Sequence, residues 1–287
     1  MPRIARLEGP VTAGSKGRPF GAAAFDLKTQ GYVEAEFFLS GEAARFRPAP
    51  GTERRADGRW SVVEAGASPY RTRLLVRRPA DPARFNGTVI LLWNNVSLGF
   101  DILTGETAEM YRDGFALVAL SAQRAGVHGF PEGPKRSLRD WDPERYGTLD
   151  LPDDEVGFDI CSQAAFLVGR NRPKGSVDPL GGLPVQRVLA MGVSQSATRL
   201  ATYLNAIQPL TNAVDGFLLD VYFGNGAALE EPKRAAPAIM RVEEINKLAK
   251  LMPPGSHRLR TDQRVPIFVM NSETEAELYA PVRQEDG

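Results

Sequence analysis

The stretch "LAMGVSQSATRL", residues 189–200, joins an apolar run to a helix-like segment through a short junction centred on Ser194. Gly192 and Ser196 lie two positions to either side of it, and such small residues are needed where a backbone turns sharply. A hydroxyl on this kind of turn is exposed beyond the end of the strand, where the N-terminal amides of the following helix face any charge that develops. The pattern predicts a nucleophile elbow of the GxSxG type, with Ser196 in place of the last glycine. The same letters also occur in ordinary loops, so the flanking elements decide between the two interpretations.

Around this turn, apolar strand-like runs alternate with amphipathic helical stretches between residues 88 and 222. This alternation is typical of an α/β fold whose mostly parallel central sheet carries helices on both faces. The predicted strands are "TVILLW", "FALVALSA", "VQRVLAMG" and "GFLLDVYF". Helices are predicted at about 102–113, closed by Gly114, and at about 159–168, opened by Asp159 and closed by Gly169. After the serine, one helical stripe of apolar residues predicts core packing: Ala197, Leu200, Ala201, Leu204 and Ile207.

The segments on either side of this region have different patterns. Residues 1–85 form a β-rich N-terminal portion, with candidate strands in "YVEAEFFL" and "YRTRLLVRRP", and the pair Asn86-Gly87 then turns the chain into the strand at 88. In the first of these, Val33, Ala35, Phe37 and Leu39 share one face. Residues 223–264 interrupt the alternation with proline-rich stretches around the helix-like "MRVEEINKLAKLM", which predicts either a lid or a cover for the sheet. "VPIFVM" at 265–270 then restarts the sheet.

Length and charge favour one large globular domain spanning residues 1–287. The chain has 287 residues, 43% of them hydrophobic, which is enough for a sizeable core. Lys and Arg number 35, as do Asp and Glu, so no net field favours nucleic acid or an anionic membrane as a partner. The basic pieces "GTERRADGR" and "LLVRRPADPARF" are short and mixed with acids, and we expect them to be solvated surface.

Cysteine content and hydropathy bear on the compartment. Cys161 is the only cysteine, which excludes an internal disulfide framework and fits a reducing environment. The N-terminal "MPRIARLEGPVTAG" has no apolar core of the length that a secretory signal needs, and no stretch approaches a membrane span. We therefore expect a cytoplasmic protein, with secretion left open.

An acyl-transfer serine also needs donors for an oxyanion and a carboxylate that follows a late strand. One donor is expected to be the amide of Gln195, and the second the amide of Val96 or a neighbour, because "WNNVSLG" leaves the sheet at the same edge. The alternative for this loop is an asparagine-rich turn without chemistry. In "VPIFVMNSETE" we prefer Glu275 over Glu273 as the acid, although adjacent glutamates in a loop are commonly surface charge.

These stretches together resemble the bacterial "α/β hydrolase domain" esterase-like family of the α/β-hydrolase superfamily. The resemblance covers nearly the whole chain and is carried by the stretches "GYVEAEFFLSGEA", "LLWNNVSLGFD", "ALSAQRAGVHG", "WDPERYGTLDLPDDEVGFDICSQAA", "MGVSQSATRL" and "VPIFVMNSETE". It implies an α/β-hydrolase-like fold, a triad in the chain order serine, acid, histidine, and no metal or organic cofactor. Ser194 and Glu275, or Glu273, take the first two places.

The histidine that this order requires does not follow the acid. Only His128 and His257 are present, and both precede Glu275. We expect each to be a structural or surface residue rather than the general base. The resemblance therefore implies a chain that lacks the C-terminal part of such an enzyme. Residues 1–287 assayed alone are expected to be weak or inactive, and the strand at 265–270 is expected to be an open apolar edge.

The residues thus favour a carboxylic ester hydrolase that acts on a small-molecule ester through an acyl-enzyme on Ser194. Two alternatives use the same parts: a noncatalytic relative that binds a ligand or a partner, and an acyltransferase in which an alcohol other than water attacks the acyl-enzyme. The sequence leaves the substrate and the oligomeric state open.

Overall fold

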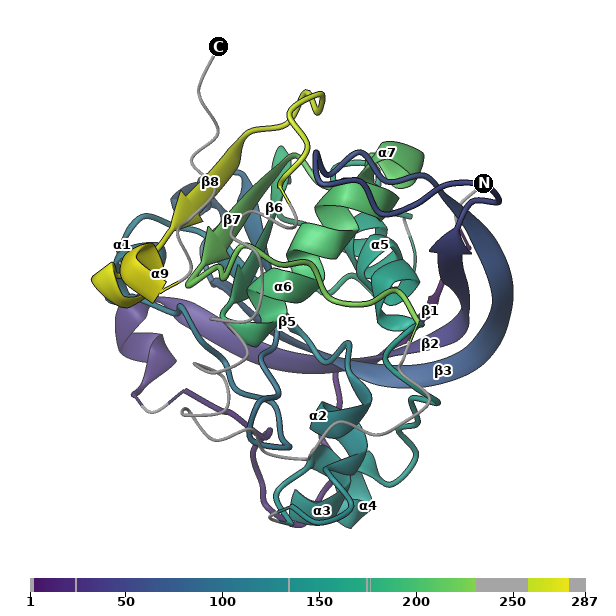
Figure 1. The fold of residues 1–287 in the computed structure, drawn as a ribbon. Coiled ribbons are helices and arrows are strands. Elements are labelled where there is room, and N and C mark those ends of the chain that lie inside the picture. Colours follow the sequence, from purple (N-terminus) through teal and green to yellow (C-terminus); the bar gives the residue numbers. More distant parts are fainter. Residues whose placement is uncertain are drawn as a thin grey trace.

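The computed structural model describes residues 3–23, 25–133, 135–173, 175, 177–230 and 258–278. Within these residues one eight-stranded sheet runs through the molecule in the order β1-β2-β3-β5-β4-β6-β7-β8 (Figure 1). Its strands are β1 (Arg6–Glu8), β2 (Tyr32–Pro48), β3 (Val62–Pro79), β4 (Thr88–Trp93), β5 (Ala116–Leu120), β6 (Arg187–Val193), β7 (Gly216–Asp220) and β8 (Ile267–Met270). The helical segments are η1 (Leu27–Gln30), η2 (Pro82–Arg84), α1 (Ala108–Arg112), α2 (Arg124–His128), α3 (Leu138–Trp141), α4 (Pro143–Tyr146), α5 (Gly157–Val168), α6 (Gln195–Thr202), η3 (Tyr203–Ile207), α7 (Gln208–Thr211) and α9 (Glu273–Leu278).

The half of the sheet from β5 to β8 is parallel, as predicted. β4 pairs in parallel with both β5 and β6, and β6 to β8 continue the parallel pairing. β1, β2 and β3 form the antiparallel half, and β3 pairs antiparallel with β5. In Figure 1 the long β2 and β3 curve together around one side of the molecule. Because parallel strands end at one common edge, the loops that follow β4, β6, β7 and β8 lie together there.

Side chains from both faces of the sheet are buried, which is why five of the six residues of its central strand are apolar. All six residues of β4 are buried. Val89, Leu91 and Trp93 contribute to the larger core, under α5 and α6, whereas Ile90 and Leu92 belong to a smaller cluster on the other face. The predicted stripe after the elbow lies in the larger core, where its five residues are each fully buried.

Two predicted helix boundaries are wrong. The helix expected at 102–113 is confined to Ala108–Arg112, because Ile102 pairs with Asn95 in an isolated bridge and Leu103 packs on the sheet instead. Gly114, with φ of 78°, ends that segment as expected. The helix expected at 159–168 begins two residues earlier, at Gly157, so Asp159 does not open it. Asp159 instead accepts a hydrogen bond from the Ala44 amide of β2 at 2.7 Å, and Gly169 closes the helix as predicted.

The interpretation of "LLVRRPADPARF" as solvated surface is wrong for residues 74–77 and 79, which are buried, and one of these residues is a cation. Arg77 in β3 is only 1% exposed. Its guanidinium pairs with Glu34 at 2.8 Å and also with Glu106, so neighbouring elements bury and neutralise it. A short basic run thus contains one of the most buried side chains of the molecule.

Among the described residues, β8 is the last strand at one end of the sheet. Phe268, Val269 and Met270 are all exposed, by 62%, 39% and 48%, although they are large apolar residues.

The predicted helix within 240–252 and most of the possible lid at 223–264 lie outside the described residues. Across the parts of the chain that the structure describes, no helix combines the length and the apolar character that crossing a bilayer requires.

Candidate active site

The junction of β6 and α6 is a strained turn centred on Ser194. This serine has φ of 58° and ψ of −116°, a backbone conformation that residues other than glycine rarely adopt. A Cβ atom on Gly192 would lie 2.7 Å from the Ser196 carbonyl oxygen, so only glycine allows the chain to double back this closely. The Ser194 amide donates to the Asp220 carbonyl of β7 at 2.9 Å, which fixes the turn at the carboxyl edge of the sheet. The structure thus has the sharp strand-to-helix turn that the sequence predicted at Ser194.

Ser196, which stands where the motif usually has glycine, closes the same turn. Its Oγ lies 2.8 Å from the Val193 amide, which donates to it, and 3.0 Å from the Val193 carbonyl, to which it donates. The side chain is fully buried, so both hydrogen bonds are made away from water. Nothing comparable holds the Ser194 hydroxyl: among the described residues no side chain or backbone group bonds to its Oγ.

The loop at 94–97 lies against this elbow, as the sequence predicted. Asn95 donates from Nδ2 to the Val193 carbonyl at 3.0 Å and accepts from the Ser97 amide at 2.9 Å, so one side chain ties the loop to β6 and shapes it. The Val96 amide points at the elbow and donates to Oε1 of Gln195 over 3.4 Å. The structure therefore brings Ser194, Gln195 and Val96 together at one edge of the sheet.

The two candidate acids differ in burial. Glu275 is 6% exposed, whereas the Glu273 side chain is exposed. The Glu275 carboxylate accepts hydrogen bonds from the amide of Ser272, at 2.9 Å, and from its hydroxyl. This is half of a capping box, which gives Glu275 a structural role at the start of α9 whether or not it is also the acid.

A carboxylate that the sequence analysis passed over, Asp220, lies beside Glu275 at the end of β7. Burial raises the pKa of Asp220, and the negative charge of Glu275 raises it further. Its signal was present in "GFLLDVYF", where an acid ends the parallel strand next to the one that carries the serine. Asp220 is therefore a second candidate for the acid of the site.

The described contacts of His128 do not include the serine. His128 lies at the end of α2, half-buried, with Nε2 3.0 Å from Asp150 Oδ1 and 3.2 Å from the Leu151 amide. Burial lowers the pKa of His128, and the charges of Arg124 and Arg139 lower it further. These neighbours belong to α2, α3 and the turn after α4, as expected for a structural histidine. His257 lies outside the described residues.

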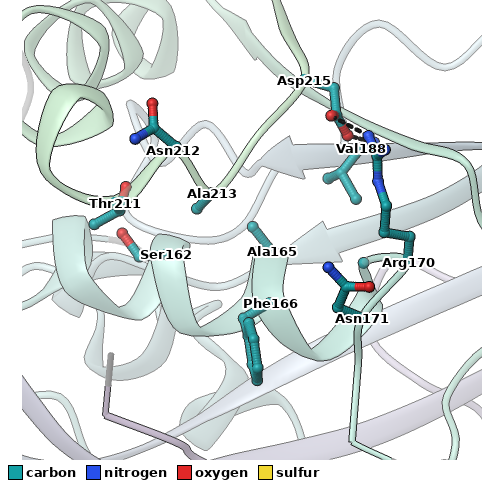
Figure 2. A pocket seen from close by; sticks show the side chains of 11 residues that line it. Ser162, Ala165, Phe166, Arg170, Asn171, Val188, Thr211, Asn212, Ala213 and Asp215 are labelled. Atoms are coloured by element: carbon teal, nitrogen blue, oxygen red, sulfur yellow. Dashed lines mark hydrogen bonds and ion pairs between the residues drawn. The ribbon is translucent and has the colours of Figure 1, made fainter. Parts of the chain in front are cut away.

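A cavity of about 330 Å³ opens at the opposite edge of the sheet (Figure 2). It is lined by the C-terminal half of α5, by Thr211, Asn212 and Ala213 after α7, and by Val188 and Asp215 at the starts of β6 and β7. Arg170 and Asp215 form an ion pair at 2.6 Å across its rim. Because parallel strands begin at this edge and end at the other, the cavity is separate from the elbow.

A family model described as "Alpha/beta hydrolase domain" matches residues 7–287. The chain belongs to this alpha/beta hydrolase family. The match includes both the antiparallel β1–β3 portion and the parallel half that carries the elbow, so the fold expected from the resemblance is confirmed.

Several esterases are among the solved structures similar to this alpha/beta hydrolase, and the likeness to them is low. A glucuronoyl esterase from Solibacter usitatus is 11% identical, with 79% of this chain and 54% of that chain covered and a TM-score of 0.35. Fungal esterases from Rhizomucor miehei are 14% identical over 78% and 52% of the chains, with a TM-score of 0.32. Acetyl xylan esterase 1 from Thermoanaerobacterium sp. is 15% identical over 62% and 52%, with a TM-score of 0.32. The chain spans about half the length of each. No curated protein shows significant similarity to it.

Proposed function

We propose that this alpha/beta hydrolase is a serine hydrolase that cleaves carboxylic esters through an acyl-enzyme on Ser194. The observation that carries the proposal is the strained elbow: its half-buried Ser194 has a hydroxyl without a partner among the described residues, and the next residue, Gln195, accepts a hydrogen bond from the Val96 amide. Strained backbone at such a position is retained when it serves a function.

In the proposed reaction Ser194 Oγ attacks the carbonyl carbon of the ester while a base accepts its proton. The carbonyl oxygen becomes an oxyanion, which accepts hydrogen bonds from the Gln195 and Val96 amides. The carbon–oxygen bond to the alcohol then breaks, the alcohol leaves with the proton, and an acyl-serine remains. A water molecule attacks this acyl-serine, which releases the carboxylic acid and restores the hydroxyl.

The general base in this proposal is neither His128 nor His257 but the histidine that, in the chain order implied by the resemblance, follows the acid, and Glu275 orients it. The contacts of His128 with α2, α3 and the turn after α4 support a structural role for it rather than that of the base. A noncatalytic protein that binds a ligand at the elbow remains the alternative, and it predicts a serine without unusual reactivity.

Fluorophosphonate labelling of the full-length protein tests the proposal. The probe phosphonylates only an activated serine, so we expect a single adduct, and peptide mass spectrometry should place it on the peptide that contains Ser194. Absence of an adduct on the folded protein, or an adduct on another serine, would overturn the assignment and favour the noncatalytic alternative.

The acid is tested by three carboxylate-to-amide variants of the full-length protein. We expect Glu275→Gln to lower kcat for a short-chain aryl ester by about 10²-fold to 10⁴-fold, because an unoriented base transfers protons slowly. The amide oxygen of glutamine still accepts a hydrogen bond from Ser272, so folding should survive. For Glu273, the exposed alternative, we expect Glu273→Gln to keep turnover within about twofold of the wild-type value, and a loss confined to that variant would assign the role to Glu273. A loss confined to Asp220→Asn would assign the role to Asp220 instead.

A further inference from the structure

The Val96 amide already has an acceptor. It donates to Gln195 Oε1 over 3.4 Å, and an amide N–H carries one hydrogen. While that hydrogen faces the carboxamide of Gln195, it cannot serve an oxyanion fully. The side chain of Gln195 therefore occupies one of the two donors that the proposed function requires, although its own backbone amide is the other donor.

The orientation of this carboxamide is determined by its neighbours. Gln195 Nε2 donates to Gln123 Oε1 at 3.1 Å, and the indole Nε1 of Trp93 donates to the same oxygen, also at 3.1 Å. An indole can only donate, so the Gln123 oxygen must face Trp93. Gln123 Nε2 in turn donates to Asp154 at 2.9 Å, and an ionised carboxylate can only accept.

The groups at both ends of this hydrogen-bonded series of side chains are fixed. The carboxamides of Gln195 and Gln123 therefore cannot be flipped. A reversed Gln195 would set its NH₂ group against the Val96 amide and its oxygen against the Gln123 oxygen, which leaves two pairs of like groups in contact. Gln123 and Trp93 are each only 1% exposed, so water does not replace these bonds readily. Asp154 also accepts from Arg199 of α6, at 2.7 Å, and so ties the hydrogen-bonded series to the helix that follows the nucleophile.

The hydrogen bond from the Val96 amide to Gln195 Oε1 is the longest of the series. At 3.4 Å it lies well beyond the usual N–H···O distance of about 2.9–3.0 Å, whereas the bonds behind it are 2.7–3.1 Å. Gln195 is also only half-buried. The contact at Val96 is thus the one that an incoming oxygen displaces at the least cost.

We propose that the Gln195 side chain gates the oxyanion hole. In the closed state its carboxamide oxygen stands where the acyl oxygen of the substrate is to bind, and binding of an ester requires that it move off the Val96 amide. The gate rests on the proposed function of Ser194. It makes Gln195 a positioning residue through its side chain, in addition to the donor role of its backbone.

The test compares rates of fluorophosphonate labelling at Ser194 in the full-length protein. The phosphoryl oxygen of the probe needs the same two amides, so removal of the competing carboxamide should speed the reaction. Gln195→Met keeps the length of the side chain without an acceptor of comparable strength, and we expect labelling to be about twofold to tenfold faster, with a lower KM for an aryl ester. Gln195→Ala should act in the same direction and serves if the methionine variant folds poorly.

Gln30→Met is the matched control, because Gln30 is exposed in η1 and its substitution should leave the rate unchanged. Labelling that is unchanged or slower in folded Gln195→Met and Gln195→Ala would overturn the gate, because removal of a competing acceptor from the Val96 amide should make the reaction faster. Failure of the proposed function is a different result: the wild-type protein itself would not be labelled at Ser194.

Discussion

Replacement of Ser194 by alanine in the full-length protein is expected to lower kcat for a short-chain aryl ester by about 10⁴-fold to 10⁶-fold. The variant keeps the oxyanion donors and the binding surface but loses the atom that attacks the ester. Its fold should be unaffected, because no described residue bonds to Ser194 Oγ and alanine meets the same backbone strain at φ of 58°. The free energy of unfolding should therefore change by less than about 0.5 kcal/mol.

Steady-state turnover and urea denaturation, measured on the same preparations, separate these two effects. Ser61→Ala is the control: the side chain of Ser61 is exposed before β3, and its loss should change neither quantity. A Ser194→Ala protein that keeps more than about a tenth of wild-type turnover would show that another group attacks the ester. A variant that loses activity only because it unfolds would show that the serine is structural.

The parallel half of the fold was predictable because its signals are local. β4 occupies the predicted residues 88–93, since a strand buried on both faces is apolar at nearly every position, here at all but Thr88. The elbow was equally local, because its glycine and serines are within five positions of one another. Helix 102–113 was overestimated because its first half is held by a pairing with Asn95, and no helical pattern reveals such a partner.

The residues of the candidate site were predictable from the sequence, but the hydrogen bond that occupies the Val96 amide was not. Strand order places the loops of Val96 and Ser194 at one edge, and the prediction needed nothing more. That the Gln195 side chain caps the Val96 amide depends on a rotamer fixed by Trp93 and Asp154, 102 and 41 positions away by residue number. Asp220 was missed because an acid at the end of a strand has the same appearance as an ordinary loop residue until its neighbour Glu275 is known.

Burial of charged residues was the least predictable feature of the chain. Glu36 on β2 and Arg73 on β3 are 2% and 0% exposed, with Arg73 Nη1 3.2 Å from Glu36 Oε1. Arg73 also pairs with Asp101 at 3.1 Å, and Arg145 pairs with the second oxygen of Glu36. Burial raises the pKa of Tyr146 to about 12, so its phenol stays protonated and donates to Glu36 at 2.8 Å. Two cations and two anions are thus neutralised inside the molecule.

We expect Glu36→Gln to lower the free energy of unfolding by about 3–5 kcal/mol, because Arg73 then keeps Asp101 as its carboxylate partner while the buried Arg145 loses the Glu36 carboxylate. The amide nitrogen of the new side chain must also face a guanidinium, and donor against donor adds an unsatisfied contact. For a domain that is stable by about 5–15 kcal/mol, this is a large share of the total. The shift of the urea midpoint, at an unchanged slope, measures the loss.

Glu64→Gln is the matched control for the buried variant. Glu64 also lies on a strand and pairs with an arginine, Arg3, at 3.0 Å, but its side chain is 58% exposed. Water screens that pair, so the same chemical change should alter stability by less than about 1 kcal/mol. Equal effects at the two positions would mean that water reaches Glu36 and that the four charges are not isolated in the core. A large difference would show that β2 and β3 are joined by an ion cluster whose disruption costs more than any one exposed pair contributes.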